Sequence, residues 1–196
     1  MINRRIPVLT LGITMVLIGL HLLVTDKTQL YFSAAEIYKG QAWRLISGHL
    51  MHADLQHLLW NCLGLVVLGT LLEYRSRRAL ITSLGAGIIF VNALLLTPFS
   101  QLDYYCGLSG VLNTLLLVAL WIEWKLTRSW LIIALAFGSI AKVLVETSQG
   151  ISIVTDISWP PYTWSHLAGL LGGLVVIYIH TRNLQSAIEG KSHPVR

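Results

Sequence analysis

The sequence predicts an all-α membrane protein with six membrane-spanning helices. Of its 196 residues, 55% are hydrophobic and only 12% are charged, whereas a soluble domain carries about 25% charged residues. A helix needs about 20 mostly apolar residues to cross the hydrocarbon core of a bilayer. Six apolar runs approach that length, at residues 7–24, 50–72, 79–96, 107–122, 130–145 and 166–180. The last three are short, which indicates little tilt or a locally thinned bilayer.

The basic residues predict the orientation of these six spans. An even number of spans puts both termini on one side, and ten of the 14 Lys and Arg residues fall on that side: Arg4, Arg5, Arg75, Arg77, Arg78, Lys125, Arg128, Arg182, Lys191 and Arg196. By the positive-inside rule, both termini are cytoplasmic. The net charge of +5 therefore reflects topology and contact with anionic lipids, and we expect no nucleic-acid partner.

The first run follows two arginines and resembles a signal peptide at first sight. It is long, however, and no small-x-small cleavage site follows it, so we interpret it as the first transmembrane helix. No repeat, low-complexity tract or linker divides the chain. We therefore expect a single domain over residues 1–196, with a basic tail from about residue 182.

Two segments on the outer side carry distinctive residues. Residues 25–49 mix polar and apolar side chains, which predicts a partly helical segment in the membrane interface, with Trp43 as an aromatic anchor and Arg44 facing the headgroups. Lys142 and Glu146 are one turn apart near the outer end of the fifth run, and we expect them to form an ion pair. Trp159-Pro160-Pro161 ends any helix before the sixth run.

Ser109 opens the fourth run within Gly107-Leu108-Ser109-Gly110. This run goes from the outer to the inner side, so its serine lies at a helix N-terminus, where backbone N–H groups and the helix dipole favour developing negative charge. Gly107 permits an unusual backbone angle, and Gly110 lets another helix approach closely. The alternative is a structural serine that bonds a carbonyl one turn back.

A serine nucleophile needs a base, and His166 is the best candidate because it opens the sixth run on the same side. Gly169 and Gly173 follow it four residues apart, a small-xxx-small surface for tight helix packing. If that surface packs on the fourth run, the His166 imidazole lies within hydrogen-bond reach of the Ser109 hydroxyl.

The second run supplies further donors. His57 and Asn61 are one turn apart on one face and can both donate to an oxyanion, although they can equally bridge two helices. His52 lies five residues earlier, at the interface. A metal site made by His49, His52 and His57 is disfavoured, because the five-residue gap turns His57 away from His52 and only Asp54 lies nearby. We predict no metal and no cofactor.

Two alternatives stay open for the cysteines. Cys62 and Cys106 both fall in the outer halves of their predicted helices. In a bacterial type of envelope the outer compartment permits a disulfide between them. Two buried, free thiols are the other reading.

Taken together, these residues closely resemble the rhomboid family of intramembrane serine proteases. The resemblance covers nearly the whole chain and rests on motifs in the family's order: Trp43-Arg44, then His52, His57 and Asn61 in HADLQHLLWN, then Gly69 and Glu73, then Gly107-Leu108-Ser109-Gly110, and His166-Leu-Ala-Gly169 with Gly173.

What the resemblance implies is a six-helix bundle with a Ser/His dyad that has no third, carboxylate member and cleaves transmembrane proteins near the outer leaflet. Ser109 would be the nucleophile and His166 the general base. The oxyanion hole would consist of His57, Asn61 and the Ser109 backbone N–H, with His52 as an accessory residue.

The short sequence and the CGLSGVLN context look like the rhombosortase branch. That implies a multi-pass protein of the bacterial inner membrane with a periplasmic active site, whose substrates carry a C-terminal tail of Gly-Gly, a transmembrane helix and a basic end. Two residues depart from the family pattern: Asn113 stands where many members have an aromatic residue, and Ser165 replaces an alanine. A proteolytically silent, client-binding relative is the alternative function.

Overall fold

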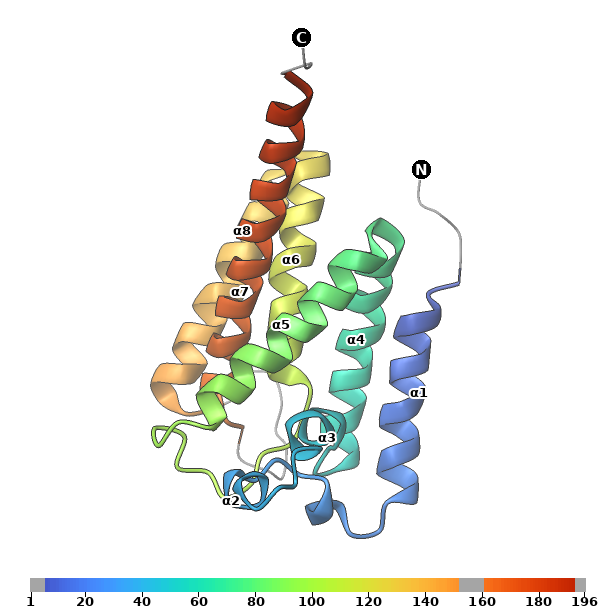
Figure 1. The fold of residues 1–196 in the computed structure, drawn as a ribbon, viewed down its shortest axis with the longest axis vertical. Coiled ribbons are helices and arrows are strands. Elements are labelled where there is room, and N and C mark those ends of the chain that lie inside the picture. The colour runs from blue at the N-terminus through green and yellow to red at the C-terminus, as the bar shows by residue number, and fades with distance from the viewer. Residues whose placement is uncertain (1–5, 152–160, 193–196) are drawn as a thin grey trace.

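The structure, a computed structural model, describes residues 6–151 and 161–192, with side chains up to Arg182. Over these residues the fold is helical and contains no strand, only an isolated bridge between Phe32 and Tyr105 (Figure 1). The helices are α1 (Val8–Leu23), the 3-10 helix η1 (Lys27–Gln29), α2 (Ala34–Tyr38), α3 (Arg44–Leu50), α4 (Leu55–Arg75), α5 (Arg77–Leu95), α6 (Ser109–Thr127), α7 (Trp130–Gln149) and α8 (Trp164–Ser192). The predicted all-helical class is confirmed for this part of the chain.

Five of the described helices are long and apolar enough to cross a membrane, namely α4, α5, α6, α7 and the part of α8 up to Arg182. Helix α1 has 16 residues, a length of about 24 Å at 1.5 Å per residue, which is shorter than a hydrocarbon core of about 30 Å. The start of α1 and the end of α8 lie at the same end of the molecule (Figure 1).

The helix boundaries correct two predictions. The second apolar run is divided: Leu50 ends α3, and α4 begins at Leu55, where Asp54 caps it by accepting a hydrogen bond from the His57 backbone N–H at 2.7 Å. The three runs predicted to be short form longer helices, of 19 residues in α6, 20 in α7 and 29 in α8. Polar residues continue α6 and α7 until a left-handed residue ends each helix, at Arg128 and Gly150.

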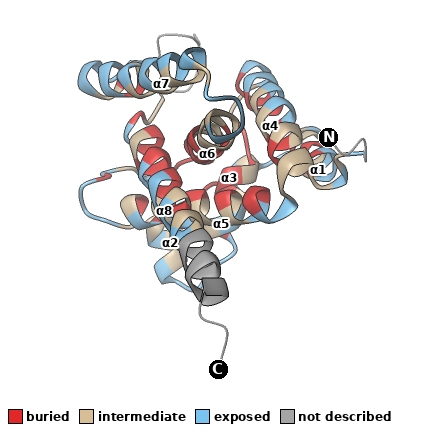
Figure 2. Ribbon diagram, turned by 90° about the horizontal axis from the view of Figure 1, so that it is seen from above, coloured by how far each residue is buried: buried red, intermediate tan, exposed pale blue. Residues whose placement is uncertain are grey.

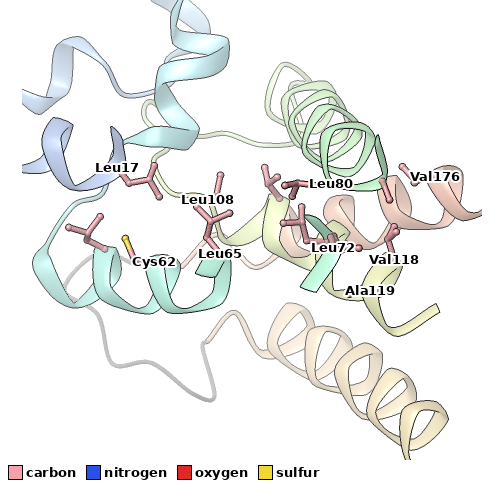
Figure 3. Packing of buried hydrophobic residues seen from close by; sticks show 13 residues of the cluster. Leu17, Cys62, Leu65, Leu72, Leu80, Leu108, Val118, Ala119 and Val176 are labelled. Carbon is pink, nitrogen blue, oxygen red and sulfur yellow. The ribbon is translucent and has the colours of Figure 1, made fainter. Parts of the chain in front are cut away.

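Helix α6 lies among α4, α5, α7 and α8 when the molecule is viewed from above (Figure 2). Its Val111, Leu115 and Val118 are at most 1% exposed. They belong to one apolar cluster that also takes side chains from α1, α4, α5 and α8 (Figure 3): Leu17, Leu65, Leu72, Leu80 and Val176. This cluster packs the first three turns of α6 against its neighbours.

Helix α1 is attached to α4 by a carboxylate. Glu73 accepts hydrogen bonds from the backbone N–H groups of Leu9 and Thr10, at 3.1 and 2.9 Å, and from the Thr10 hydroxyl at 2.9 Å. These N–H groups belong to the first turn of α1, where no intrahelical acceptor exists. A Cβ at Gly69 would come within 2.9 Å of the Thr10 side chain, so this glycine permits the close approach.

Helix α7 is the least buried of the five long helices. Only 11% of its span is buried, compared with 39% for each of the others. Its buried residues are Val143 and Glu146. Most of α7 therefore faces outward, and a carboxylate is one of its two points inside the protein.

The segment from α1 to α4 contains the short helices η1, α2 and α3, in agreement with the predicted partly helical segment. Trp43 is 54% exposed, as an interface anchor requires, but Arg44 is only 6% exposed. Its guanidinium donates to the carbonyls of Thr28 and Tyr31, at 2.7 and 2.6 Å. The prediction that Arg44 faces lipid headgroups is wrong, because its charge is used to fold the segment on itself.

Candidate active site

Ser109 and His166 lie in contact at one end of the bundle. Ser109 is the first residue of α6 and His166 is in the first turn of α8. The distance between Ser109 Oγ and His166 Nε2 is 3.0 Å, and His166 is 9% exposed. A hydroxyl and an imidazole at this distance form the pair that a nucleophilic serine needs, since the ring nitrogen can take the hydroxyl proton.

The turn before Ser109 is fixed by Gly107. This glycine has φ +118°, and a Cβ on it would come within 2.6 Å of the Nε2 and Cε1 atoms of His57. Its N–H donates to the carbonyl of Gly48 at 3.0 Å, and its own carbonyl accepts from the Tyr105 hydroxyl at 3.1 Å. The backbone therefore enters α6 in a conformation that favours glycine, with the His57 ring directly against it.

The first turn of α6 points its backbone N–H groups toward this region. Leu108 occupies the N-cap position, and no side chain caps the helix there. Uncapped N–H groups and the positive end of the helix dipole stabilise negative charge. The site around Ser109 thus has an intrinsic preference for a developing oxyanion.

Close packing of α8 on α6 brings His166 to Ser109. A Cβ at Gly169 would overlap the carbonyl oxygen of Gly110, and one at Gly173 would lie 3.1 Å from the Leu117 side chain. The Thr114 hydroxyl donates to the Gly169 carbonyl at 2.6 Å. A side chain at position 169 would therefore push the two helices, and the two polar groups, apart.

His57 and Asn61 lie on α4 beside the same turn, 7% and 3% exposed. The Asn61 amide donates to the His57 carbonyl at 2.8 Å, which uses one of its two N–H hydrogens and leaves the second. Among the described residues, His57 Nδ1 and Asn61 Oδ1 have no hydrogen-bond partner. Buried polar atoms of this kind are uncommon and need an explanation, such as a catalytic role or an ordered water.

His52 and His49 flank this group without joining it into a metal site. The His52 ring packs edge-on against His57, with centroids 5.0 Å apart. His49 lies 3.2 Å from Asn92 Oδ1, a contact that connects α3 to α5. Burial lowers the pKa of His49 to about 4 and that of His52 to about 3, so both rings are neutral near pH 7. No cluster of three or more potential metal ligands occurs in the part of the chain that the structure describes.

Glu146 is a residue of the site that the sequence reasoning did not assign to it. The expected ion pair with Lys142 is present, at 2.7 Å. However, the Glu146 side chain is fully buried, and its Oε2 lies 3.4 Å from Nδ1 of His166. A usable signal was in the sequence: Glu146 is at the outer end of its helix, at the same depth as the start of the sixth apolar run.

The two residues that depart from the family pattern bond to nearby backbone. The Asn113 amide donates to the Ser109 carbonyl at 2.9 Å, and the Ser165 hydroxyl donates to the Tyr162 carbonyl at 2.7 Å. Asn113 therefore supplies no aromatic face for His166. Of the Trp159-Pro160-Pro161 helix break, Trp159 and Pro160 lie outside the described residues, as do Arg4, Arg5, the side chain of Lys191 and Arg196 of the basic set.

Both cysteines are free and buried, so the disulfide that the sequence left open is not formed. Cys62 packs in the cluster with Leu58 and Leu65, whereas Cys106 packs with Tyr31 and Met51. The two thiols face different neighbours, which accounts for the absence of a bridge. Burial raises the pKa of Cys106 to about 12, which makes its thiol unreactive.

The described residues form a helical bundle with five helices long enough to span a membrane, and a serine and a histidine are in contact at the N-terminal ends of two of these helices. These features are typical of a multi-pass membrane protein with a serine–histidine site. The chain belongs to the rhomboid family, because the family model described as "Rhomboid domain" matches residues 39–183. The chain is also similar to the Rhomboid protease GluP of Bacillus subtilis (strain 168), with 29% identity over 153 residues. That alignment covers 75% of this chain and 28% of the relative, so the chain spans well under half of the length of the curated protein it matches.

Proposed function

We propose that the protein is an intramembrane serine endopeptidase. The observation that carries the proposal is the contact of 3.0 Å between Ser109 Oγ and His166 Nε2, at a helix N-terminus inside a bundle of membrane-spanning length. Membership of the rhomboid family supports it, and so does the similarity to a protein whose name is rhomboid protease.

In the proposed reaction, His166 Nε2 accepts the proton of Ser109 Oγ as the oxygen attacks the carbonyl carbon of the scissile peptide bond. The negative charge on the carbonyl oxygen is stabilised by the Ser109 N–H, the His57 imidazole and the free N–H of Asn61. The histidine then gives its proton to the leaving amine, which leaves an acyl-enzyme on Ser109. Water, deprotonated by the same ring, hydrolyses the ester.

In the proposed topology, α1 and the five long helices together make six spans. Both termini lie in the cytoplasm, and the site lies on the outer side. Two observations support it: Ser109 and His166 begin helices at the end of the bundle opposite the start of α1 and the end of α8, and the basic residues gather on the terminal side. In a bacterial inner membrane the site then faces the periplasm.

The proposed substrates are secreted or surface proteins with a C-terminal tail of the rhombosortase type. The support is the CGLSGVLN context around the serine. The tail contains a Gly-Gly motif, a transmembrane helix and a basic end, and cleavage near the outer leaflet would release the protein from the membrane.

The test is cleavage of such a tail-bearing protein by the purified enzyme in liposomes. Wild-type protein should cut it, Ser109→Ala and His166→Ala should not, and a matched substrate with Val-Val in place of Gly-Gly should be cut more slowly. Persistent cleavage by folded Ser109→Ala protein refutes the protease assignment, whereas equal cleavage of both substrates refutes only the tail specificity.

A second candidate is a silent relative that binds membrane proteins without cutting them. A fluorophosphonate probe distinguishes the two, because it reacts only with an activated serine. Labelling of wild-type protein at Ser109 supports the protease, and an unlabelled but substrate-binding protein supports the alternative.

A further inference from the structure

Glu146 is a fully buried carboxylate on a helix that is otherwise mostly exposed. Its side chain has 0% exposure, although only 11% of the α7 span is buried. An ionised group in an apolar interior is costly unless it is paired. A residue with no role would be expected to point outward from this helix, so the inward position calls for an explanation.

The two oxygens of Glu146 have different neighbours. Oε1 lies 2.7 Å from Nζ of Lys142 on the same helix, and the Lys142 side chain is 39% exposed. Oε2 lies 3.4 Å from Nδ1 of His166, on α8. The other ring nitrogen of His166 is the one in contact with Ser109, at 3.0 Å. A carboxylate, an imidazole and a hydroxyl therefore follow one another across α7, α8 and α6.

We propose that Glu146 is a positioning residue that completes a Ser–His–Glu arrangement in this protein. The inference rests on the proposed serine protease function and deepens it. A carboxylate facing Nδ1 favours the tautomer with its proton on Nδ1, which leaves Nε2 free to accept the Ser109 proton. When that proton arrives, the carboxylate stabilises the imidazolium. In this role Glu146 does not take up the proton and forms no bond to substrate.

The contact of 3.4 Å is not a hydrogen bond, since His166 Nδ1 has no hydrogen-bond partner among the described residues, whereas a tight N–H···O bond measures about 2.9 Å. Such contacts tighten in many enzymes only when substrate binds. Lys142 also shares the charge of the carboxylate. Both facts predict a smaller effect than the roughly 10⁴-fold loss seen when a buried aspartate of a classical triad is neutralised.

The other charged groups on the helices around His166 are few. Lys142 on α7 faces Glu146, and the His57 ring on α4 lies against Gly107, two residues before Ser109. Helices α5 and α6 carry their charged residues at the opposite end of the bundle, namely Arg77, Arg78, Glu123 and Lys125. Glu146 is thus the only carboxylate that the described part of these helices places at His166.

The competing explanation is that Glu146 only forms a structural ion pair with Lys142. The two explanations differ in what loss of the lysine does. If Glu146 acts on His166, Lys142→Gln leaves the reaction largely intact, because the glutamine can still hydrogen-bond the carboxylate. If the ion pair is the whole role, Lys142→Gln and Glu146→Gln have the same effect.

The experiment measures the rate at which a fluorophosphonate probe labels Ser109 in the full chain in nanodiscs, as a function of pH. Glu146→Gln should label about 10²-fold more slowly than wild type, with the acid limb of its pH profile moved to lower pH. Glu146→Asp should recover part of the rate. Lys142→Gln and the control Glu123→Gln, which breaks an ion pair with Arg75 at the other end of the bundle, should stay within about threefold.

Wild-type labelling that is absent or independent of Ser109 would refute the proposed function itself. Normal wild-type labelling with an unchanged rate and pH profile in Glu146→Gln, or an equal loss in Lys142→Gln, would overturn this inference alone.

A second measurement tests the inference without replacing Glu146, so that it holds even where Glu146→Gln misfolds. The ¹⁵N NMR signal of His166, assigned by its loss in His166→Gln, should report a proton on Nδ1, and a neutral ring protonated on Nε2 would also overturn the inference.

Discussion

His57 and Asn61 both lie on α4 beside the turn that precedes Ser109. The His57 ring touches Gly107, and the Asn61 amide keeps one N–H after bonding the His57 carbonyl. If both donate to the oxyanion, replacing either one removes a hydrogen bond made mainly in the transition state. We expect His57→Ala and Asn61→Ala each to lower kcat about 10²-fold with little change in KM. Cleavage kinetics in liposomes measure this, and a change in KM alone would contradict the assigned role.

The buried imidazoles of His49 and His52 make the protein sensitive to acid. Burial lowers their pKa values from the ordinary 6.5 to about 4 and about 3. Between pH 6.5 and these values the unfolded chain takes up protons that the folded protein does not, so stability is complete above pH 6.5 and falls as the pH is lowered.

Thermal unfolding in detergent measures this dependence. The midpoint temperature should drop progressively below pH 6.5, and His52→Gln should flatten the drop whatever its effect at neutral pH. The control His180→Gln, far from the site on α8, should keep the wild-type dependence. An identical slope for His52→Gln and wild type would contradict the assignment.

At the scale of residues, the sequence predicts which side chains lie at the same depth in the membrane. It does not predict which side of a helix faces the protein interior. Ser109 and His166 were expected to be near one another because both open a span on the same side, and they lie 3.0 Å apart. Arg44 was expected to face lipid headgroups and Glu146 only to pair with Lys142, yet both side chains are buried, and Glu146 also lies against His166. The apolar residues of α7 surround the whole helix, so its pattern does not reveal which side faces the protein.

The α6–α8 contact depends on a missing side chain. A Cβ at Gly169 would overlap the Gly110 carbonyl, so Gly169→Ala must separate the helices. We expect a destabilisation of about 1–3 kcal/mol and a loss of probe labelling at Ser109. Gly138→Ala is the matched control, because nothing lies within 4 Å of its added methyl group, and an exposed Gly to Ala change in a helix is neutral or slightly stabilising. Equal stability and labelling of the two variants would refute this account of the interface.

At the scale of elements, composition predicts which segments are helical better than where each helix ends. The apolar runs correspond to α1 and to the five long helices. The ends differ because hydropathy records the apolar part alone, whereas a helix continues through polar residues such as Glu123 and Lys125 until its hydrogen bonding is interrupted. The division between α3 and α4 follows from the Asp54 cap, a local signal inside an apolar run.

The orientation of the whole molecule is open to a direct test. In a variant with Cys62 and Cys106 replaced by alanine, a single cysteine is introduced at Asp103, which precedes α6, or at Thr127, which ends it, both exposed. If the serine side faces the periplasm, a membrane-impermeant maleimide should label position 103 in intact spheroplasts and position 127 only after lysis. The opposite pattern would reverse the proposed topology.

At the scale of the whole molecule, the sequence predicts the family and the helical class, and the family model agrees. The number of spans is harder to derive from the sequence, because α1 has only 16 residues. Its attachment to the bundle depends on hydrogen bonds from its first turn to Glu73. A tertiary contact of this kind leaves no trace in hydropathy. Topology therefore rests on the distribution of basic residues, which is independent of helix packing.

The sparse burial of α7 would give the surrounding lipid a direct influence on the proposed reaction. Only 11% of the α7 span is buried, so in a bilayer lipid rather than protein would contact most of this helix, while its inner face presents Glu146 to His166. A change in acyl-chain length or lateral pressure that shifts α7 by a small amount would alter the spacing between carboxylate and imidazole before it disturbed the rest of the bundle. Turnover in this protein should accordingly respond to bilayer composition even where its thermal stability does not.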